Sequence, residues 1–286
     1  MRRDLRWWFQ RLTVSYTGTV GAIIVLAVLF VAIFAPYISP HDPWLANLGA
    51  RFAPPFWSQN AVPGYLLGTD QLGRDVLSRI LYGTRVSLIV GLAASAISAV
   101  VGVTLGLVAG YYGGWLEDVF MRITDALAAF PKIALYLVVM TMFGAGFVIL
   151  ILTLGLVRWS SFARLVRGEV LSVKQKEYVE AAHAIGQNAT RIMGRHIVPN
   201  VFASIIVLGT LEIAAVIIAE ASLSFLGVGV PPPAISWGRM LSDGRDYLAS
   251  AYWIATFPGI AITMTVLGVF MLGDWLRDVL DPRLKQ

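Results

Sequence analysis

Long apolar runs alternate with short polar segments along the whole chain. A helix needs about 20 mainly apolar residues to cross a bilayer, and six of these runs are long enough. The pattern therefore predicts an all-α polytopic membrane protein with six transmembrane helices. They are expected over residues 18–38, 86–110, 120–144, 147–166, 201–225 and 252–274.

The amino-terminal segment, residues 1–17, is basic and contains Trp7, Trp8 and Phe9. This composition is typical of an amphipathic lead-in at the membrane surface, and a disordered tail is the alternative. The apolar run that follows could also be a signal peptide. It is long for one, however, and no Ala-x-Ala cleavage site follows, so we interpret 18–38 as an anchor helix.

The distribution of Lys and Arg predicts the orientation. With the amino terminus inside, sixteen of the twenty-two basic residues fall in cytoplasmic segments. Cytoplasmic loops of membrane proteins carry an excess of such residues, so both termini are expected in the cytoplasm. The chain then divides into the lead-in, the anchor, an external loop over 39–85, a permease core over 86–276 and a tail over 277–286. The core contains a cytoplasmic loop over 169–200.

Polar motifs are prominent in the two external segments. The first contains Gly68-Thr69-Asp70-Gln71-Leu72-Gly73-Arg74-Asp75, directly before the second span. Asp70, Arg74 and Asp75 are expected to form a cluster of ion pairs and helix caps. The second, residues 226–250, is stiffened by consecutive prolines and contains Trp237 and Arg239. We interpret these five residues as candidates for an external gate or a contact with a binding protein.

One face of the second span carries only small residues. They recur at every fourth position, which places them on one face of a helix where another helix can approach its backbone. Glycine is common in transmembrane helices, but a run of five favours a packing face. The residues are Ala94, Ser98, Gly102, Gly106 and Gly110.

Composition agrees with a membrane protein and excludes several chemistries. Hydrophobic residues make up 57% of the chain, charged residues 14%, and there is no cysteine. Disulfides, thiolate metal sites and cysteine nucleophiles are therefore excluded. The net charge of +5 does not indicate nucleic-acid binding, because the basic residues are spread over loops. His41, His183 and His196 show no metal-ligand spacing, and we expect no Ser-His-Asp set. We therefore interpret them as surface residues and expect the chain not to be an enzyme.

The cytoplasmic loop holds the most informative motif. Glu180-Ala181-Ala182 is followed by three residues and then Gly186, and Pro199 follows thirteen positions beyond that glycine. Small side chains at 181 and 182 would let a short helix approach a partner closely. Gly186 can end that helix, and Pro199 suits the first turn of the next one.

These segments resemble the C-type permease of the dipeptide, oligopeptide and nickel importers of the ATP-binding-cassette class. The resemblance covers the chain from about residue 14 to its end. His196 and Val198 depart from the general pattern of the loop, and Lys132 and Glu212 are unusual for the subfamily. The matching segments are residues 68–79, 110–114, 121–125 with Phe130-Pro131, 164–168, the Glu180–Pro199 motif, 219–227, 236–238 and 280–283.

The resemblance implies a type I importer with a MetI-like fold in a bacterial plasma (inner) membrane. It implies a B-type permease partner, two ATPase subunits that hold ATP and Mg, and an external solute-binding protein. Docking on the ATPase would fall to Glu180, Ala181, Ala182, Gly186 and Pro199. The chain has no Gly-Lys dipeptide and hence no Walker A loop, so it is expected to bind no cofactor itself.

Two other questions stay open at this stage. An ion-coupled secondary transporter is the rival class, but the inverted repeats expected of one are not apparent. Within the importer class, peptides are the first expectation for the cargo. Nickel or other metal chelates come second and oligosaccharides third.

Three of the charged residues inside the predicted spans are candidates for the transport pathway: Lys132, Glu212 and Glu220. Lys132 and Glu212 lie at a similar expected depth, and an isolated charge there costs about 2.5–3.5 kcal/mol on insertion scales. We therefore expect them to pair or to face a water-filled pathway, where they would meet charged peptide termini. The alternative is that Lys132 extends to the interface and Glu212 faces the partner permease.

Overall fold

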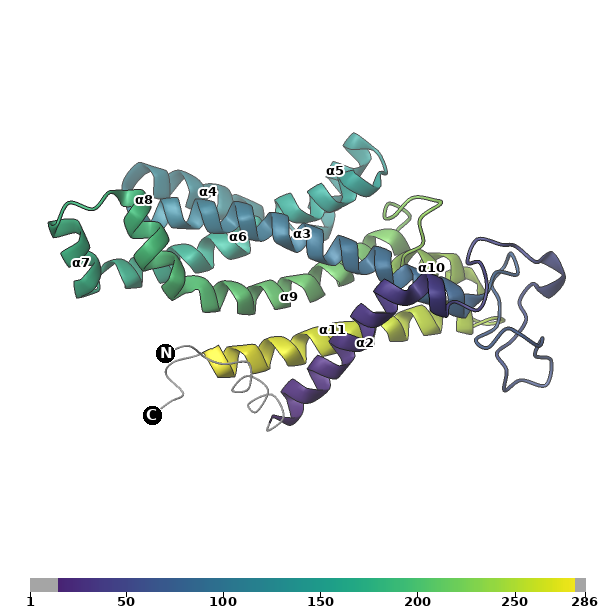
Figure 1. Cartoon of the computed structure of the whole chain (residues 1–286). Coiled ribbons are helices and arrows are strands. Elements are labelled where there is room, and N and C mark those ends of the chain that lie inside the picture. The colour runs from purple at the N-terminus through teal and green to yellow at the C-terminus, as the bar shows by residue number, and fades with distance from the viewer. Residues whose placement is uncertain (1–14, 281–286) are drawn as a thin grey trace.

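The computed structural model describes residues 15–280, which fold into helices joined by loops (Figure 1). The predicted lead-in over 1–17 and tail over 277–286 lie mostly outside this range. The elements are α2 (Tyr16–Ile38), η1 (Leu48–Ala50), α3 (Val76–Tyr112), α4 (Gly114–Ala129), α5 (Lys132–Phe143), α6 (Phe147–Lys174), α7 (Glu177–Ala184), α8 (Ala189–Ile192), the π-helical turn η2 (Met193–Ile197), α9 (Val198–Phe225), α10 (Trp237–Gly244), η3 (Arg245–Tyr247) and α11 (Trp253–Leu280).

Within the described residues, five helices are long and apolar enough to cross a membrane. They are α2, α3, α6, α11 and the continuous helical stretch from α8 into α9. Each coincides with one of the predicted apolar runs, so these five helices are confirmed. Several are longer than expected because a helix continues past its apolar stretch into the polar boundary region.

The third predicted span, 120–144, is wrong as a single helix. Two helices, α4 and α5, meet at an angle of 94° across a short break. The break is at Phe130 and Pro131, where Phe130 has extended backbone angles. A residue before proline is driven away from the helical region, and proline itself suits the start of the next helix, so the chain turns here.

The external loop is also shorter than expected, because α3 begins at Val76 rather than near residue 86. The Asp75 carboxylate caps the helix by accepting a hydrogen bond from the backbone N–H of Ser78, at 3.2 Å. This bond satisfies one of the free N–H groups of the first turn. Asp75 therefore ends the external loop and fixes where the longest helix starts.

The small-residue face of α3 packs against α6, as the spacing predicted. A Cβ built on Gly102 or Gly106 would come within 2.3 and 2.7 Å of backbone oxygens of α6, so both positions require glycine. On the same face the Ser98 hydroxyl donates to the Gly155 carbonyl at 2.8 Å. Close backbone approach of this kind is how membrane helices gain packing energy.

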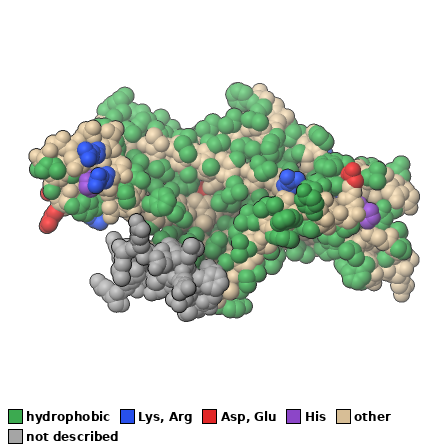
Figure 2. All heavy atoms as spheres, viewed as in Figure 1, with side chains coloured by type: hydrophobic (Ala, Val, Ile, Leu, Met, Phe, Trp, Pro, Cys, Tyr) green, Lys and Arg blue, Asp and Glu red, His purple; other side chains and the backbone are tan. Residues whose placement is uncertain are grey.

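Polar side chains gather at the two ends of the elongated molecule. On the face drawn in Figure 2, the middle is mostly hydrophobic and the charged side chains lie mainly towards the ends. One end carries the short helices α7 and α8, and the other carries α10 and the loop before α3 (Figure 1). We call these the coupling end and the external end, after the cytoplasmic and external positions that the sequence predicts for their segments.

Candidate functional site

Helix α7 at the coupling end stops at a glycine-dependent cap. Gly186 has a φ of +77°, a backbone conformation in which a side chain is strained. Its N–H donates to the His183 carbonyl at 2.9 Å, and the Gln187 N–H donates to the Ala182 carbonyl at 3.1 Å. These two bonds form a Schellman motif, so the predicted helix end at Gly186 is confirmed.

The Glu-Ala-Ala triplet of α7 divides between solvent and core. Glu180 and Ala181 are exposed, whereas Ala182 is only 3% exposed and packs in an apolar cluster with Val179 and Ile192. The expectation that Ala182 offers a small edge to a partner is therefore wrong. Its small side chain instead lets α7 lie close to the rest of its own chain, which orients the exposed face.

An exposed apolar residue completes the outer surface of α7. Ile185 follows the helix directly and is 74% exposed. Pro199, the second residue of α9, is also exposed and stands in the first turn as predicted. The coupling end thus presents Glu180, Ala181, Ile185 and Gly186 to solvent while Ala182 anchors them.

The loop histidines hold this segment in place, a role that their spacing did not indicate. His183 Nε2 lies 3.2 Å from the Tyr111 hydroxyl, and the two rings stack. The Lys174 ammonium donates to the Tyr111 carbonyl at 2.6 Å. Tyr111 is the penultimate residue of α3, so α7 is tied to the end of a membrane helix. His196 is similarly placed, with Nε2 3.3 Å from the Gln187 side-chain oxygen.

At the external end, Asp70 organises its own loop. One carboxylate oxygen accepts hydrogen bonds from the backbone N–H groups of Leu72 and Arg74, at 2.8 and 3.0 Å. The other accepts from Arg74 Nε at 2.7 Å. Asp70 is 2% exposed. The predicted cluster of ion pairs and caps around Asp70, Arg74 and Asp75 is therefore confirmed.

The same cluster extends to α10, far away in the sequence. Arg79 is 4% exposed and lies between two carboxylates, with Asp70 at 3.5 Å and Asp243 at 3.4 Å. Asp243 also pairs with Arg239 at 3.1 Å and approaches Arg74 at 3.8 Å. We call these five residues the external latch, because they join the loop before α3 to α10: Asp70, Arg74, Arg79, Arg239 and Asp243.

A serine, a histidine and an aspartate do meet at the external end, contrary to expectation. His41 Nδ1 lies 3.3 Å from Asp75 Oδ2, and the Ser78 hydroxyl donates to that same oxygen at 2.5 Å. The carboxylate stands between the other two groups. A catalytic triad needs the histidine in the middle, so this cluster caps α3 and has no nucleophile–base contact.

Trp237 and Glu220 lie inside the external end and not on its surface. Trp237 is 2% exposed, and its indole N–H donates to the Ile80 carbonyl at 3.1 Å. Trp237 therefore offers no surface to a binding protein in this structure, and its role in an external gate stays a prediction. Glu220 Oε1 accepts from the Ser224 and Ser236 hydroxyls, at 2.7 and 2.8 Å, which joins α9 to the start of α10.

In the middle of the molecule the structure pairs Glu212 with Arg158, not with Lys132. The Arg158 Nε donates directly to Glu212 Oε2, between α6 and α9. Lys132 lies within electrostatic range of both but has no ion pair among residues 15–280. The predicted direct pair of Lys132 and Glu212 is therefore wrong. Lys132 opens α5 directly after the bend, so its depth could not be counted along a straight span.

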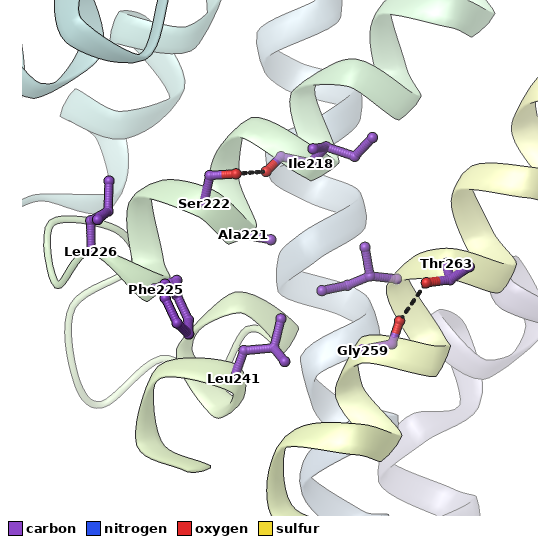
Figure 3. A pocket seen from close by; sticks show the side chains of 9 residues that line it. Ile218, Ala221, Ser222, Phe225, Leu226, Leu241, Gly259 and Thr263 are labelled. Atoms are coloured by element: carbon purple, nitrogen blue, oxygen red, sulfur yellow. Dashed lines mark hydrogen bonds between the residues drawn. The ribbon is translucent and has the colours of Figure 1, made fainter. Parts of the chain in front are cut away.

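An apolar groove of about 500 Å³ lies between α9, α10 and α11 (Figure 3). The Ser222 and Thr263 hydroxyls in its wall donate to carbonyls of their own helices, at 2.8 and 2.9 Å. These hydroxyls are therefore already used and leave the groove apolar. The lining residues are Ile218, Ala221, Ser222, Phe225, Leu226, Leu241, Gly259, Ile262 and Thr263.

Comparison with known proteins identifies the family. Residues 102–286 match the family described as binding-protein-dependent transport system inner membrane component. Residues 6–55 match the N-terminal TM domain of oligopeptide transport permease C. The first match covers more than half of the chain, so the chain belongs to the family of binding-protein-dependent transport system inner membrane components.

Curated relatives agree over nearly the full length. The dipeptide transport system permease protein DppC of Haemophilus influenzae is 40% identical over 93% of this chain and 90% of its own. The glutathione transport system permease protein GsiD of Pectobacterium atrosepticum is 40% identical over 100% and 93%. The oligopeptide transport system permease protein OppC of Bacillus subtilis is 39% identical over 93% and 86%.

These findings define the molecule at the level of its class. It is a permease subunit of an ATP-binding-cassette importer and a multi-pass protein of the bacterial inner membrane. The resemblance drawn from the sequence motifs is therefore confirmed.

Proposed function

We propose that this chain forms half of the translocation pathway for small peptides. The relatives are named as transporters of dipeptides, oligopeptides and glutathione, which supports peptides over metal chelates or oligosaccharides as the cargo. The other half would be a B-type permease. In this arrangement the bent pair α4–α5 counts as the sixth span of a MetI-like fold, and both termini lie in the cytoplasm, as the sixteen inside basic residues favour.

The coupling end is the proposed docking site for an ATPase subunit. The observation that supports it is the division of α7, with Ala182 buried and Glu180, Ala181 and Ile185 exposed. A partner that covers this surface would bury the large apolar side chain, and the small and acidic residues beside it would allow close and polar contacts. ATP and Mg belong to two such partner subunits, and this chain acts without a cofactor of its own.

The external end is the proposed contact with the solute-binding protein. Arg239, whose side chain is 35% exposed, is the latch residue most open to a partner. From inside, Trp237 fixes α10 on α3 and Glu220 fixes its start on α9. Opening of the pathway to the outside would then move α10 and the loop before α3 as one piece.

Reconstitution tests the proposal directly. The chain is assembled with its partner permease and both ATPases in proteoliposomes, and a peptide-loaded binding protein is added outside. We expect the loaded protein to stimulate ATP hydrolysis and to support peptide uptake. Uptake driven by an ion gradient without ATP would instead support a secondary transporter. Mass spectrometry of the ligand that co-purifies with the binding protein identifies the cargo, and a nickel chelate or an oligosaccharide would overturn the peptide assignment.

A further inference from the structure

Three polar side chains from three helices lie together near the middle of the membrane-spanning bundle, and a fourth, Lys132, lies within electrostatic range of them. Arg158 and Glu212 form the ion pair, which joins α6 to α9 about midway along each helix. Tyr136 of α5 stands beside Arg158, and Lys132 lies one turn earlier on α5. Ionisable groups at this depth are costly, and where they occur they commonly mark the path of a substrate.

The group has more hydrogen-bond donors than acceptors. Glu212 supplies the one carboxylate, and it is already bound by Arg158 through Nε. The two terminal guanidinium nitrogens of Arg158 make no hydrogen bond to a carboxylate among residues 15–280 and have the Tyr136 hydroxyl beside them, and the Lys132 ammonium brings three further donors. Counting Arg158, Lys132 and Glu212, the group carries one net positive charge.

Tyr136 points to a missing acceptor. The residue is 1% exposed, and its buried hydroxyl donates to no acceptor among residues 15–280, because the adjacent Arg158 side chain is itself only a donor. A buried hydroxyl without an acceptor costs about 1–3 kcal/mol, so such groups are rarely left in this state. An incoming acceptor beside Arg158 would take this hydroxyl proton in a hydrogen bond and accept from the arginine's terminal nitrogens as well.

We propose that Lys132, Arg158 and Tyr136 form a transient binding site for the carboxylate of a peptide in transit. The inference rests on the proposed function, since it names the part of the cargo that this chain recognises. A carboxylate is the acceptor that suits a planar guanidinium and an ammonium together. The apolar groove of Figure 3, whose hydroxyls are used by their own helices, offers no such partner.

Glu212 keeps the site weak enough for transport. It competes with the cargo for Arg158, so a peptide carboxylate gains the difference between two similar partners and not a full ion pair. Lys132, partly exposed at the bend before α5, is the group through which the cargo enters. A site in a transport pathway must also release what it binds. Release stays possible here because Glu212 already balances the charge of Arg158, so that only Lys132 offers a charge without an ion pair among residues 15–280.

The test compares a dipeptide with its carboxy-terminal amide in the fully assembled, reconstituted importer. Each is supplied on saturating, fully loaded binding protein, so that recognition by that protein does not limit uptake. We expect the wild-type complex to prefer the acid. Lys132→Met lowers acid uptake about tenfold and leaves amide uptake nearly unchanged, because a charged hydrogen-bond partner is lost. Lys132→Arg keeps the preference.

Two further variants separate binding from structure. Tyr136→Phe removes one oxygen and keeps the ring, and we expect it to lower acid uptake about threefold with little effect on the amide. Arg85→Met is the matched control, because it removes an exposed positive charge from α3 away from this group. It should leave the acid-to-amide ratio unchanged.

The outcomes are distinguishable. Equal loss of acid and amide uptake in Lys132→Met, with normal assembly and ATPase stimulation, would show a structural role or a partner on the other permease, and would overturn the inference. An unchanged acid-to-amide ratio in Lys132→Met and Tyr136→Phe would overturn it as well. Failure of the wild-type complex to move any peptide would overturn the proposed function itself.

Discussion

The external and coupling ends of this permease subunit differ in whether their polar groups are paired within the chain. In the external latch the charged side chains pair with one another, and Arg79 is buried between Asp70 and Asp243. The coupling end leaves Glu180 and Ile185 in solvent and holds α7 by the packing of Val179 and Ala182 and by the contact of His183 with Tyr111. At the first end the charged groups pair within one chain. At the second, an acidic and an apolar side chain stay exposed, which is the feature on which the proposed ATPase docking rests.

The largest effect is expected from breaking the latch. Arg79→Ala leaves two carboxylates, Asp70 and Asp243, without their central partner, and loss of one member of a buried ion pair costs about 3–5 kcal/mol. We expect a large drop in thermal stability of the detergent-purified protein. Arg245→Ala is the matched control, because Arg245 pairs with Asp246 on the surface, where such pairs contribute about 0–1 kcal/mol. Equal stability of the two variants would contradict the account.

Glu220 tests the inner side of the same end. Glu220→Ala removes the acceptor of two buried serine hydroxyls and should destabilise the protein by about 1–3 kcal/mol. Glu220→Gln keeps an acceptor oxygen and removes a buried charge whose second oxygen has no partner, so we expect stability close to wild type. Thermal unfolding of both variants checks this. A loss with Gln as large as with Ala would show that the charge itself is needed.

At the coupling end two neighbouring alanines should behave differently. Ala182→Leu forces a larger side chain into the cluster around Ile192 and should destabilise the protein by about 1–3 kcal/mol. Ala181→Leu changes an exposed position, so stability should hold while co-purification of the ATPase falls. Measuring both properties in both variants is decisive. The two variants losing the ATPase equally, with equal stability, would contradict the assigned orientation of α7.

The smallest effect concerns the tie between α7 and α3. Tyr111→Phe removes the hydroxyl that contacts His183, a loss of about 0.5–1.5 kcal/mol. We expect the protein to remain folded but to hydrolyse more ATP per peptide imported, because α7 follows α3 less closely. Tyr112→Phe, an exposed neighbour, is the control. If wild type and Tyr111→Phe hydrolyse the same amount of ATP per imported peptide, the contact of Tyr111 with His183 plays no part in coupling.

Much of this architecture is predictable from apolar runs and motif spacing, for a physical reason. A membrane span needs a long apolar stretch, and caps such as Asp75 and Gly186 act on their own neighbours in sequence. Local rules of this kind place the helices and their ends. The bend at Pro131 is predictable from the same local rules, because the residue before a proline avoids the helical region.

Contacts between distant segments were not predictable in the same way. Depth along a helix can be counted, but the direction in which a side chain points depends on how helices pack. Glu212 therefore has Arg158 as its partner, although Lys132 was expected at a similar depth. Ala182 faces inward and Ala181 outward for the same reason. The meeting of Asp243 with Arg79 likewise arises from folding of α10 onto α3.

Cross-linking from α7 tests the central claim, that the coupling end is the surface on which an ATPase docks. The chain contains no cysteine, so Ala181→Cys can carry a single thiol-attached photo-crosslinker in the assembled importer. We predict a covalent adduct with an ATPase subunit from this position and none from Leu45→Cys at the external end, where Leu45 is 69% exposed. Absence of an ATPase adduct from both Ala181→Cys and Ile185→Cys, in a complex that still hydrolyses ATP, would contradict it.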